Sequence, residues 1–328
     1  MKAAPVFRGR FFHIQKNEVF VMNRYDVIVV GGGPAGLTAA LYAARAGKSV
    51  LVLEGESTGG QIKFSPLVEN YPGIPGMSGA QYGETLTRQA EDLGVEIRNE
   101  GVTAMSPLAE GVELTTDRGS YTALSVVLAT GVSHRKIGLP GEEDLVGMGI
   151  SYCAVCDGAF YTGLHAAVVG GGDTALQDAL FLSARCAKVT VIHRRDQFRG
   201  EQRLVEKLRA RPNVEFLLSY RVEELLYTED GLTGLNLVDL KSGEGKELAV
   251  DGLFVAVGQE PRNQAFAGVV ATDESGYFLA GEDCRTNLPG VFAAGDCRVK
   301  SVRQLTTAVG DGAVAGLAAC AHVDACRD

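Results

Sequence analysis

YDVIVVGGGPAG, residues 25–36, joins an apolar run to a glycine-rich turn. The apolar run predicts a buried parallel strand, and the stretch from Leu37 to Ala46, which lacks helix breakers, predicts a helix directly after the turn. In such a strand–turn–helix unit the first glycine permits the tight turn, the second lets the backbone approach a pyrophosphate, and the third lets the helix pack on the strand. Gly31, Gly33 and Gly36 occupy these three positions.

A further strand is expected at residues 49–53 and ends at Glu54. An acidic side chain at this place can accept hydrogen bonds from the ribose hydroxyls of a dinucleotide. Glu56, or the backbone of residues 55–61, is the alternative ribose partner. Because the expected helix also offers free N–H groups at its N-terminus, this segment predicts a dinucleotide site.

The stretch AAVVGGGDTA, residues 166–175, repeats the pattern and again precedes a helix rich in Ala and Leu. Its next expected strand, 189–192, ends in a basic cluster in place of the acid: His193, Arg194, Arg195 and Arg199. Guanidinium groups pair well with phosphate, so this second site is expected to prefer NADP(H), whose 2′-phosphate would meet the cluster. A solvated surface cluster is the alternative interpretation.

The five residues CAVCD, which begin at Cys153, lie between the two turns in sequence. A CxxC pair in that place indicates an electron relay, in which one nucleotide supplies a hydride and a second carrier passes the electrons to Cys153 and Cys156. The alternatives are two incidental core cysteines and half a zinc site, but no two further zinc ligands lie close in sequence, so no metal is expected. Asp157 is expected to act as a general acid and base, with an ordinary turn residue as the alternative.

Composition limits the classes of protein that this chain can represent. At 328 residues it is long enough for about two domains. The net charge of −9 argues against nucleic acid as a partner, and no apolar run is long enough to span a bilayer. The seven cysteines are an odd number, and the CxxC cysteines are the one closely spaced pair. This pattern suits a reducing compartment and predicts a cytoplasmic protein rather than a disulfide framework.

The order of these segments predicts an α/β fold with two Rossmann-like, three-layer dinucleotide-binding domains. Residues 1–21 are expected to be an N-terminal extension without the pattern of a signal peptide. Residues 22–131 form the first part of one domain, 132–260 form a second domain that carries the CxxC, and 261–328 return to complete the first. Connections rich in Gly and Pro, near 131–140 and 259–263, would join the two domains. A second domain that continues to the C-terminus is the alternative.

Eight motifs give the chain a resemblance to a known family. It resembles the low-molecular-weight thioredoxin reductases of bacteria, which are flavoproteins with two dinucleotide-binding domains. The resemblance runs from about Tyr25 to near Ala319. Its markers are GGGPAG at Gly31, GGQ at Gly59, ATG at Ala129, CAVCDG at Cys153, GGGDTA at Gly170, HRRDQFR at His193, FAAGD at Phe292 and RQLTTAVGDG at Arg303.

The resemblance implies two cofactors and the residues that hold them. FAD would be bound by the first domain, through Gly31, Gly33, Pro34, Ala35, Gly36, Glu54, Gly55, Gly60, Gln61, Asn70, Thr130, Gly131, Asp296, Arg303, Gln304 and Leu305. NADPH would be bound by the second domain, through Gly170, Gly172, Asp173, Thr174, His193, Arg194, Arg195 and Arg199.

The resemblance also implies the reaction. NADPH would reduce thioredoxin through FAD, with Cys156 as the thiol nearer the flavin and Cys153 as the thiol that attacks the thioredoxin disulfide. A homodimer is expected, as is rotation of the NADPH domain, because the CxxC and the nicotinamide must reach the same flavin face in turn. The alternatives are a related flavin-dependent NADPH reductase with another disulfide or a ferredoxin-type acceptor, and a redox or nucleotide sensor without turnover.

Overall fold

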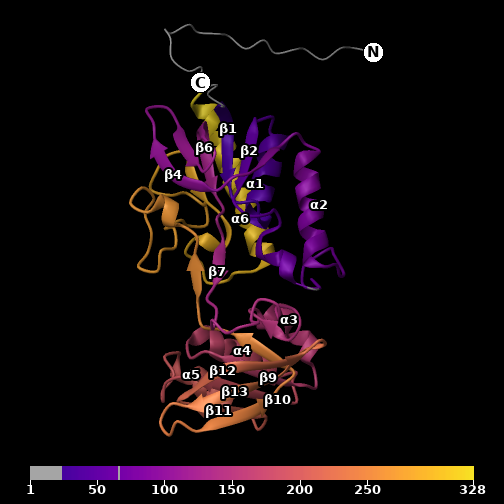
Figure 1. Ribbon diagram of the computed structural model, residues 1–328. Coiled ribbons are helices and arrows are strands. Elements are labelled where there is room, and N and C mark those ends of the chain that lie inside the picture. The colour runs from indigo at the N-terminus through magenta and orange to yellow at the C-terminus, as the bar shows by residue number, and fades with distance from the viewer. Residues whose placement is uncertain (1–23, 66) are drawn as a thin grey trace.

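Two α/β units lie end to end in the computed structural model, which describes residues 24–65 and 67–328 (Figure 1). The expected extension 1–21 lies outside the described residues. The first unit is built on a seven-stranded sheet with the order β3-β2-β1-β6-β5-β4, and β17 pairs with β6. Its strands are β1 (Arg24–Val30), β2 (Val50–Glu54), β3 (Glu96–Asn99), β4 (Val102–Pro107), β5 (Val112–Thr116), β6 (Ser120–Leu128) and β17 (Val291–Ala293).

Parallel pairing of the central strands gives this sheet two buried faces. β1 pairs in parallel with both β2 and β6, and Val27, Ile28 and Val29 are fully buried. Both faces of such a strand are covered, which explains the continuous apolar run in the sequence. One face packs against helices, and on the other face the apolar side chains, including those of β4 and β5, form a second core with Phe266 and Phe278.

The helices of the first unit come from both ends of the described chain. They are α1 (Pro34–Arg45), α2 (Gly79–Glu91) and α6 (Leu305–Ala325), with short 3-10 turns η1 (Gly60–Phe64), η3 (Gln264–Phe266) and η4 (Gly295–Cys297). α6 packs directly on α1, and Figure 1 shows it, in yellow, behind the first strands. A Cβ at Gly312 would lie 2.2 Å from the Ala35 carbonyl oxygen, so the two backbones approach as closely as glycine allows.

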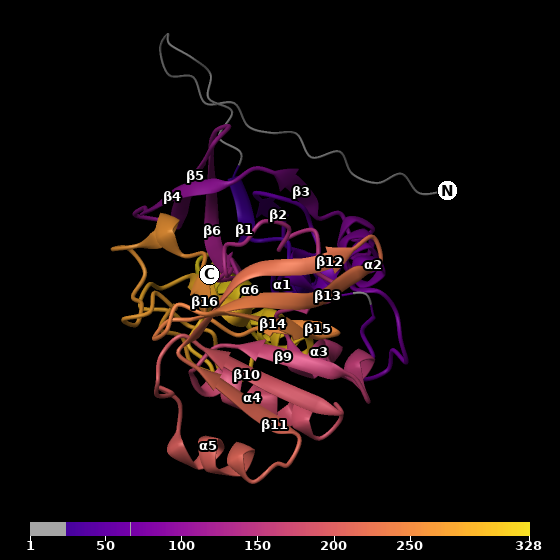
Figure 2. The ribbon, with the colours of Figure 1, turned by 60° about the horizontal axis from the view of Figure 1, so that its bottom comes forward.

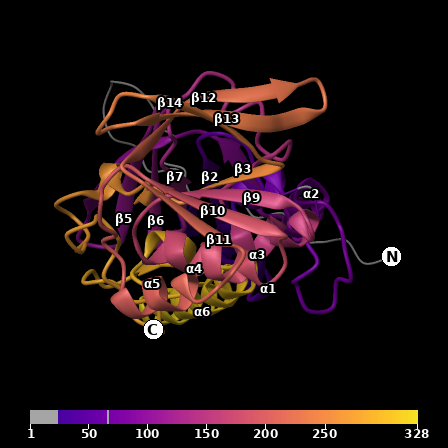
Figure 3. The ribbon, with the colours of Figure 1, turned by 90° about the horizontal axis from the view of Figure 1, so that it is seen from below.

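The second unit is a three-layer arrangement around a parallel sheet with the order β11-β10-β9-β15-β8. Helices cover one face and a three-stranded antiparallel sheet covers the other, as Figures 2 and 3 show. The parallel strands are β8 (Ile150–Ser151), β9 (His165–Val169), β10 (Lys188–His193), β11 (Val214–Leu218) and β15 (Gly252–Val255). The helices are α3 (Ala154–Asp157), η2 (Gly158–Tyr161), α4 (Asp173–Ser183) and α5 (Gln202–Arg209), and the covering strands are β12 (Tyr220–Thr228), β13 (Gly231–Asp239) and β14 (Gly245–Ala249).

A two-stranded ribbon connects the units. β7 (Val132–His134) and β16 (Gln259–Pro261) pair antiparallel, at the two places where the sequence predicts connections. Arg262 donates to Ser133 Oγ at 2.6 Å and pairs with Glu56 at 2.8 Å, which ties the ribbon to the first unit. The α/β fold with two Rossmann-type units is as predicted, whereas the boundaries 22–131, 132–260 and 261–328 stay predictions.

Candidate active site

The first glycine turn forms a cradle at the N-terminus of α1. Gly31 has φ +104°, and a Cβ there would lie 2.3 Å from the Ala129 carbonyl oxygen. A Cβ at Gly36 would lie 1.9 Å from the Gly31 carbonyl oxygen, whereas Gly33 faces more open space, with its nearest neighbour 3.7 Å away. No side chain caps the N-terminus of α1, so the first N–H groups of Pro34–Arg45 can face an anion.

The Glu54 carboxylate orders the loop beside this cradle. One oxygen accepts from the Gly32 N–H at 2.6 Å, and the other accepts from the Glu56 N–H at 2.9 Å. Gly60 lies on the other side of the turn, where a Cβ would be 3.0 Å from the Gly33 Cα. Each carboxylate oxygen of Glu54 retains a lone pair that can accept from a ribose hydroxyl. The ribose contact itself stays a prediction.

Asp296 presents a buried oxygen without a partner near the same cradle. Its Oδ1 forms no hydrogen bond within the described residues, and burial raises the pKa of the carboxyl group, against an opposing effect of Lys300 and Arg303. A buried acceptor of this kind requires a donor. A ribityl hydroxyl of FAD would be such a donor, so Asp296 fits the group that the sequence implies.

Two further predicted FAD residues, Thr130 and Arg303, are engaged in contacts within the protein. Thr130 Oγ donates to the buried Asn263 at 2.6 Å, and Asn263 donates in turn to the carbonyl oxygens of Gly276 and Cys297. Arg303 donates to the Asp296 carbonyl oxygen at 3.2 Å, and its guanidinium lies 4.3 Å from the ring centre of Tyr277. The sequence did not indicate Asn263, because a polar residue in a connection carries no periodic signal.

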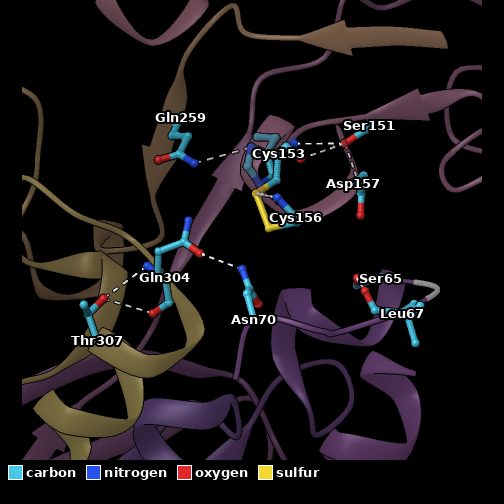
Figure 4. Close-up of a disulfide and its surroundings, with 11 residues drawn as sticks. Ser65, Leu67, Asn70, Ser151, Cys153, Cys156, Asp157, Gln259, Gln304 and Thr307 are labelled. Carbon is cyan, nitrogen blue, oxygen red and sulfur yellow. Dashed lines mark hydrogen bonds between the residues drawn. A yellow bond between two sulfur atoms is a disulfide. The ribbon is translucent and has the colours of Figure 1, made fainter. Parts of the chain in front are cut away.

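The CxxC cysteines form a disulfide at the start of α3. The Cys153 and Cys156 Cα atoms lie 5.3 Å apart, and the Cys156 N–H donates to Cys153 Sγ at 3.2 Å. Figure 1 shows α3 on the side of the second unit that faces the first. In the close-up, Asn70 and Gln304 of the first unit lie in the surroundings of the disulfide (Figure 4). Gln304 accepts from Asn70 at 3.5 Å, so two predicted FAD residues meet there.

Asp157 directly follows Cys156, and the pKa of its carboxyl group is raised. Burial raises its pKa, and a hydrogen bond from Ser151 at 2.6 Å partly opposes the rise. Its Oδ1 is buried and has no partner among the described residues. A carboxyl group in this state keeps its proton to higher pH than an exposed one, which suits a general acid. Sequence reasoning missed Ser151, which no motif pointed to.

The second glycine turn precedes α4 and has arginines beside it. The Arg199 N–H donates to the Gly171 carbonyl oxygen at 2.7 Å, and the Glu201 N–H donates to Asp173 at 2.7 Å, so the loop 199–201 packs on the turn. Arg194, Arg195 and Arg199 are exposed. Arg203 nearby pairs with Glu201, whereas these three arginines form no salt bridge within residues 24–65 and 67–328. Unpaired guanidinium groups at this place fit a ribose phosphate.

His193 lies beneath the second turn rather than beside it. The side chain is buried, stacks on Phe198 with ring centres 5.5 Å apart, and comes so close that a Cβ at Gly171 would lie 2.1 Å from its Cε1. Burial lowers its pKa, and the neighbouring arginines lower it further. His193 is therefore a neutral ring that supports the turn, and its direct contact with a nucleotide stays a prediction.

Comparison with known proteins places this arrangement in a family. The model of the pyridine nucleotide-disulphide oxidoreductases matches residues 25–312. A thioredoxin reductase of Listeria innocua is 41% identical over 304 residues, which cover 93% of this chain and 95% of the relative. Within the described residues, no cluster of three or more His, Cys, Asp or Glu side chains is arranged to hold a metal ion, and no helix is long and apolar enough to cross a membrane.

Solved structures agree with the sequence relatives. The crystal structure of thioredoxin reductase from Streptococcus pyogenes shares 38% sequence identity with this chain and has a TM-score of 0.88. The match covers 92% of this chain and 99% of the Streptococcus chain. A Lactococcus lactis thioredoxin reductase in the FR conformation is 37% identical with the same coverage, but its TM-score is 0.65. The chain belongs to the pyridine nucleotide-disulphide oxidoreductase family, within the low-molecular-weight thioredoxin reductases that its motifs indicated.

Proposed function

We propose that this chain catalyses the NADPH-dependent reduction of thioredoxin through FAD and the Cys153–Cys156 pair. One observation carries the proposal: the disulfide lies on the side of the second unit that faces the first, beside Asn70 and Gln304. A disulfide with a purely structural role would not be expected between two units that each carry a nucleotide-binding turn. The names of the relatives supply the acceptor, since both sequence and structure comparisons lead to proteins named for thioredoxin.

Each unit would hold one cofactor in this proposal. FAD would lie along the cradle of Gly31 to Gly36, with Asp296 accepting from a ribityl hydroxyl. NADPH would lie along the second turn, with Arg194, Arg195 and Arg199 at the 2′-phosphate. FAD supplies the chemistry that side chains lack, because it accepts a hydride and releases two electrons to a disulfide.

The side chains manage the protons and the sulfur exchange. Reduction of the disulfide breaks the bond between Cys153 and Cys156 with two electrons and two protons, and Asp157, whose pKa is raised by burial, directly follows Cys156 and would supply one of the protons. A Cys153 thiolate would then attack the thioredoxin disulfide, and Cys156 would resolve the mixed disulfide to release reduced thioredoxin. The enzyme returns to the disulfide form that the structure shows.

Assembly and location complete the proposal. We expect a homodimer in a cytoplasmic, reducing environment, as the resemblance and the cysteine pattern indicate. Light scattering during size-exclusion chromatography measures the mass of the holoprotein, and a monomeric mass would overturn the dimer. Detection of the protein in fractionated cells tests the location.

Cysteine variants test the reaction directly. Cys153→Ser and Cys156→Ser should each abolish NADPH-dependent reduction of a bacterial thioredoxin, because the relay then lacks one sulfur. Cys326→Ser is the matched control, since Cys326 is exposed and lies near the C-terminus, directly after α6 of the first unit. Thioredoxin reduction that survives the loss of either CxxC cysteine would overturn the proposed function.

A further inference from the structure

Ser151 connects the first redox cysteine to Asp157. Its hydroxyl oxygen lies 2.6 Å from Asp157 Oδ2, where it can donate to an ionised carboxylate or accept from a protonated carboxyl group, and it accepts from the Cys153 N–H at 3.0 Å. The Cys153 carbonyl oxygen lies 3.4 Å from the same hydroxyl and is its second possible acceptor. Figure 4 shows this hydroxyl between the backbone of Cys153 and the carboxyl group.

The fold holds Ser151 firmly in this place. It is the last residue of β8, where its partner is Phe254 of the buried strand β15, and it is 3% exposed. A hydroxyl that is buried to this degree has little access to bulk solvent and depends on partners within the protein. Its hydrogen therefore points either to Asp157 or to the Cys153 carbonyl oxygen.

We propose that Ser151 is a positioning residue for the redox step, whose hydroxyl hydrogen points to Asp157 when that carboxyl group is ionised and to the Cys153 carbonyl oxygen when it is protonated. The inference rests on the proposed function for its role in turnover, but its geometry does not. An ionised carboxylate accepts hydrogen bonds and cannot donate them, whereas a protonated one can donate to Ser151. A single hydroxyl can serve both states by rotation about its C–O bond.

The rotation of the Ser151 hydroxyl matches the change in protonation of Asp157 during the reaction. When two electrons split the disulfide, one departing thiolate takes the proton of Asp157, and the carboxyl group becomes a carboxylate. The second proton comes from solvent. The Ser151 hydroxyl then stabilises the new carboxylate, and it withdraws this support when Asp157 recovers its proton during reoxidation.

Other titratable groups near Asp157 must be kept apart from this effect. Tyr161 on η2 senses the charge of Asp157, and burial raises its pKa to about 12, so it stays neutral in the working range. α4 packs on α3 and carries Asp178, one turn before Phe181 and Leu182, which contact Gly158. Burial raises the pKa of Asp178 to about 7, so this carboxyl group must be removed in a control.

The test measures protonation of Asp157 without thioredoxin or NADPH. Infrared absorption of protonated carboxyl groups is followed against pH in the oxidised holoprotein, and subtraction of the Asp157→Asn spectrum isolates one residue. Ser151→Ala removes a hydrogen bond to a charged group, so it should raise the midpoint by on the order of one pH unit. Ser151→Thr keeps the hydroxyl and should restore the original midpoint, and the shift should persist in an Asp178→Asn background.

Controls separate positioning from stability and from the proposed function. Ser183→Ala removes another buried hydroxyl of the same unit, which donates to the Leu180 carbonyl oxygen, and it should leave the midpoint unchanged. In turnover, the alkaline limb that reports loss of the Asp157 proton should move to higher pH in Ser151→Ala. An unchanged infrared midpoint in folded Ser151→Ala overturns the inference. If the midpoint shifts in Ser151→Ala but the unmodified protein does not reduce thioredoxin, the proposed function is overturned and the inference about Ser151 stands.

Discussion

At the scale of single residues, we expect three exposed arginines to decide which nucleotide the second unit prefers. Arg194, Arg195 and Arg199 are exposed beside the second glycine turn, while the His193 ring lies beneath it. The exposed guanidinium groups are therefore available for a phosphate, and the buried imidazole holds the turn in place. We therefore expect substitutions of the arginines to affect the binding of NADPH directly.

Arg194→Ala and Arg199→Ala should each raise the KM for NADPH by about ten- to hundredfold. A hydrogen bond to a charged group contributes about 1.5–3 kcal/mol, and about 1.4 kcal/mol corresponds to a tenfold change. The KM for NADH should hardly change, because NADH lacks the 2′-phosphate. Arg209→Ala, an exposed arginine on α5, is the control and should change neither value. Steady-state kinetics with both nucleotides measure the effect, and equal losses for NADH and NADPH would contradict it.

The sequence predicted which residue types gather at the site better than how each one is oriented. Glycine spacing located both turns, because only certain backbone conformations fit there. His193 was grouped with the arginines because they are consecutive, and nothing in the sequence showed that its ring points under the turn. Asn263 was missed because its partners Thr130 and Cys297 are distant from it in sequence, and Ser151 was missed because no motif includes it.

At the scale of elements, the close contact between α1 and α6 supports the glycine turn at which we expect FAD to bind. Gly312 and Gly316 lie one turn apart on α6, and each would place a Cβ against the backbone of α1, at the carbonyl oxygens of Ala35 and Ala39. α6 also begins at Leu305, directly after Gln304, so its position determines where the predicted flavin contacts lie. The sequence predicted a helix from about Leu305, but not that its glycines serve helix packing.

Gly312→Ala should destabilise the protein by about 1–3 kcal/mol, because its Cβ would lie 2.2 Å from the Ala35 carbonyl oxygen and force the helices apart. Retention of FAD, read from visible absorbance after gel filtration, should fall in parallel. Gly310→Ala on the same helix is exposed and meets no atom within 4 Å, so it should be neutral or stabilise by about 0.4–1 kcal/mol. Thermal unfolding measures both variants. Equal melting temperatures for the two would contradict this account of the packing.

At the scale of the whole molecule, we expect the two units to adopt more than one arrangement. The Streptococcus and Lactococcus structures have nearly the same identity and coverage, but TM-scores of 0.88 and 0.65, and the latter is in the FR conformation. Such a difference fits rigid units placed differently about a connection. In this chain Arg262 ties the ribbon of β7 and β16 to the first unit through Glu56, so we expect the second unit to turn beyond the ribbon.

A crosslink between the units should separate the two halves of the reaction. Phe64 and Met148 are both exposed, and a Cβ at Gly147 would lie 3.8 Å from the Phe64 carbonyl oxygen, so these residues border the two units. Phe64→Cys with Met148→Cys, joined by a short bismaleimide, should hold the disulfide toward the first unit. Electron exchange between FAD and the disulfide should proceed, and reduction of FAD by NADPH should slow strongly. With a second crosslinker that contains a cleavable bond, cleavage should restore the reduction of FAD by NADPH. Normal rates for both half-reactions in the crosslinked protein would contradict the rotation.

The most direct measurement for the whole account is an anaerobic titration of the holoprotein with NADPH, followed by flavin absorbance. If electrons pass from NADPH through FAD into Cys153 and Cys156, the protein should take up more than one equivalent before the flavin is fully bleached, whereas Cys156→Ser should need about one. Bleaching of the unmodified protein by a single equivalent, with no difference from Cys156→Ser, would contradict the account.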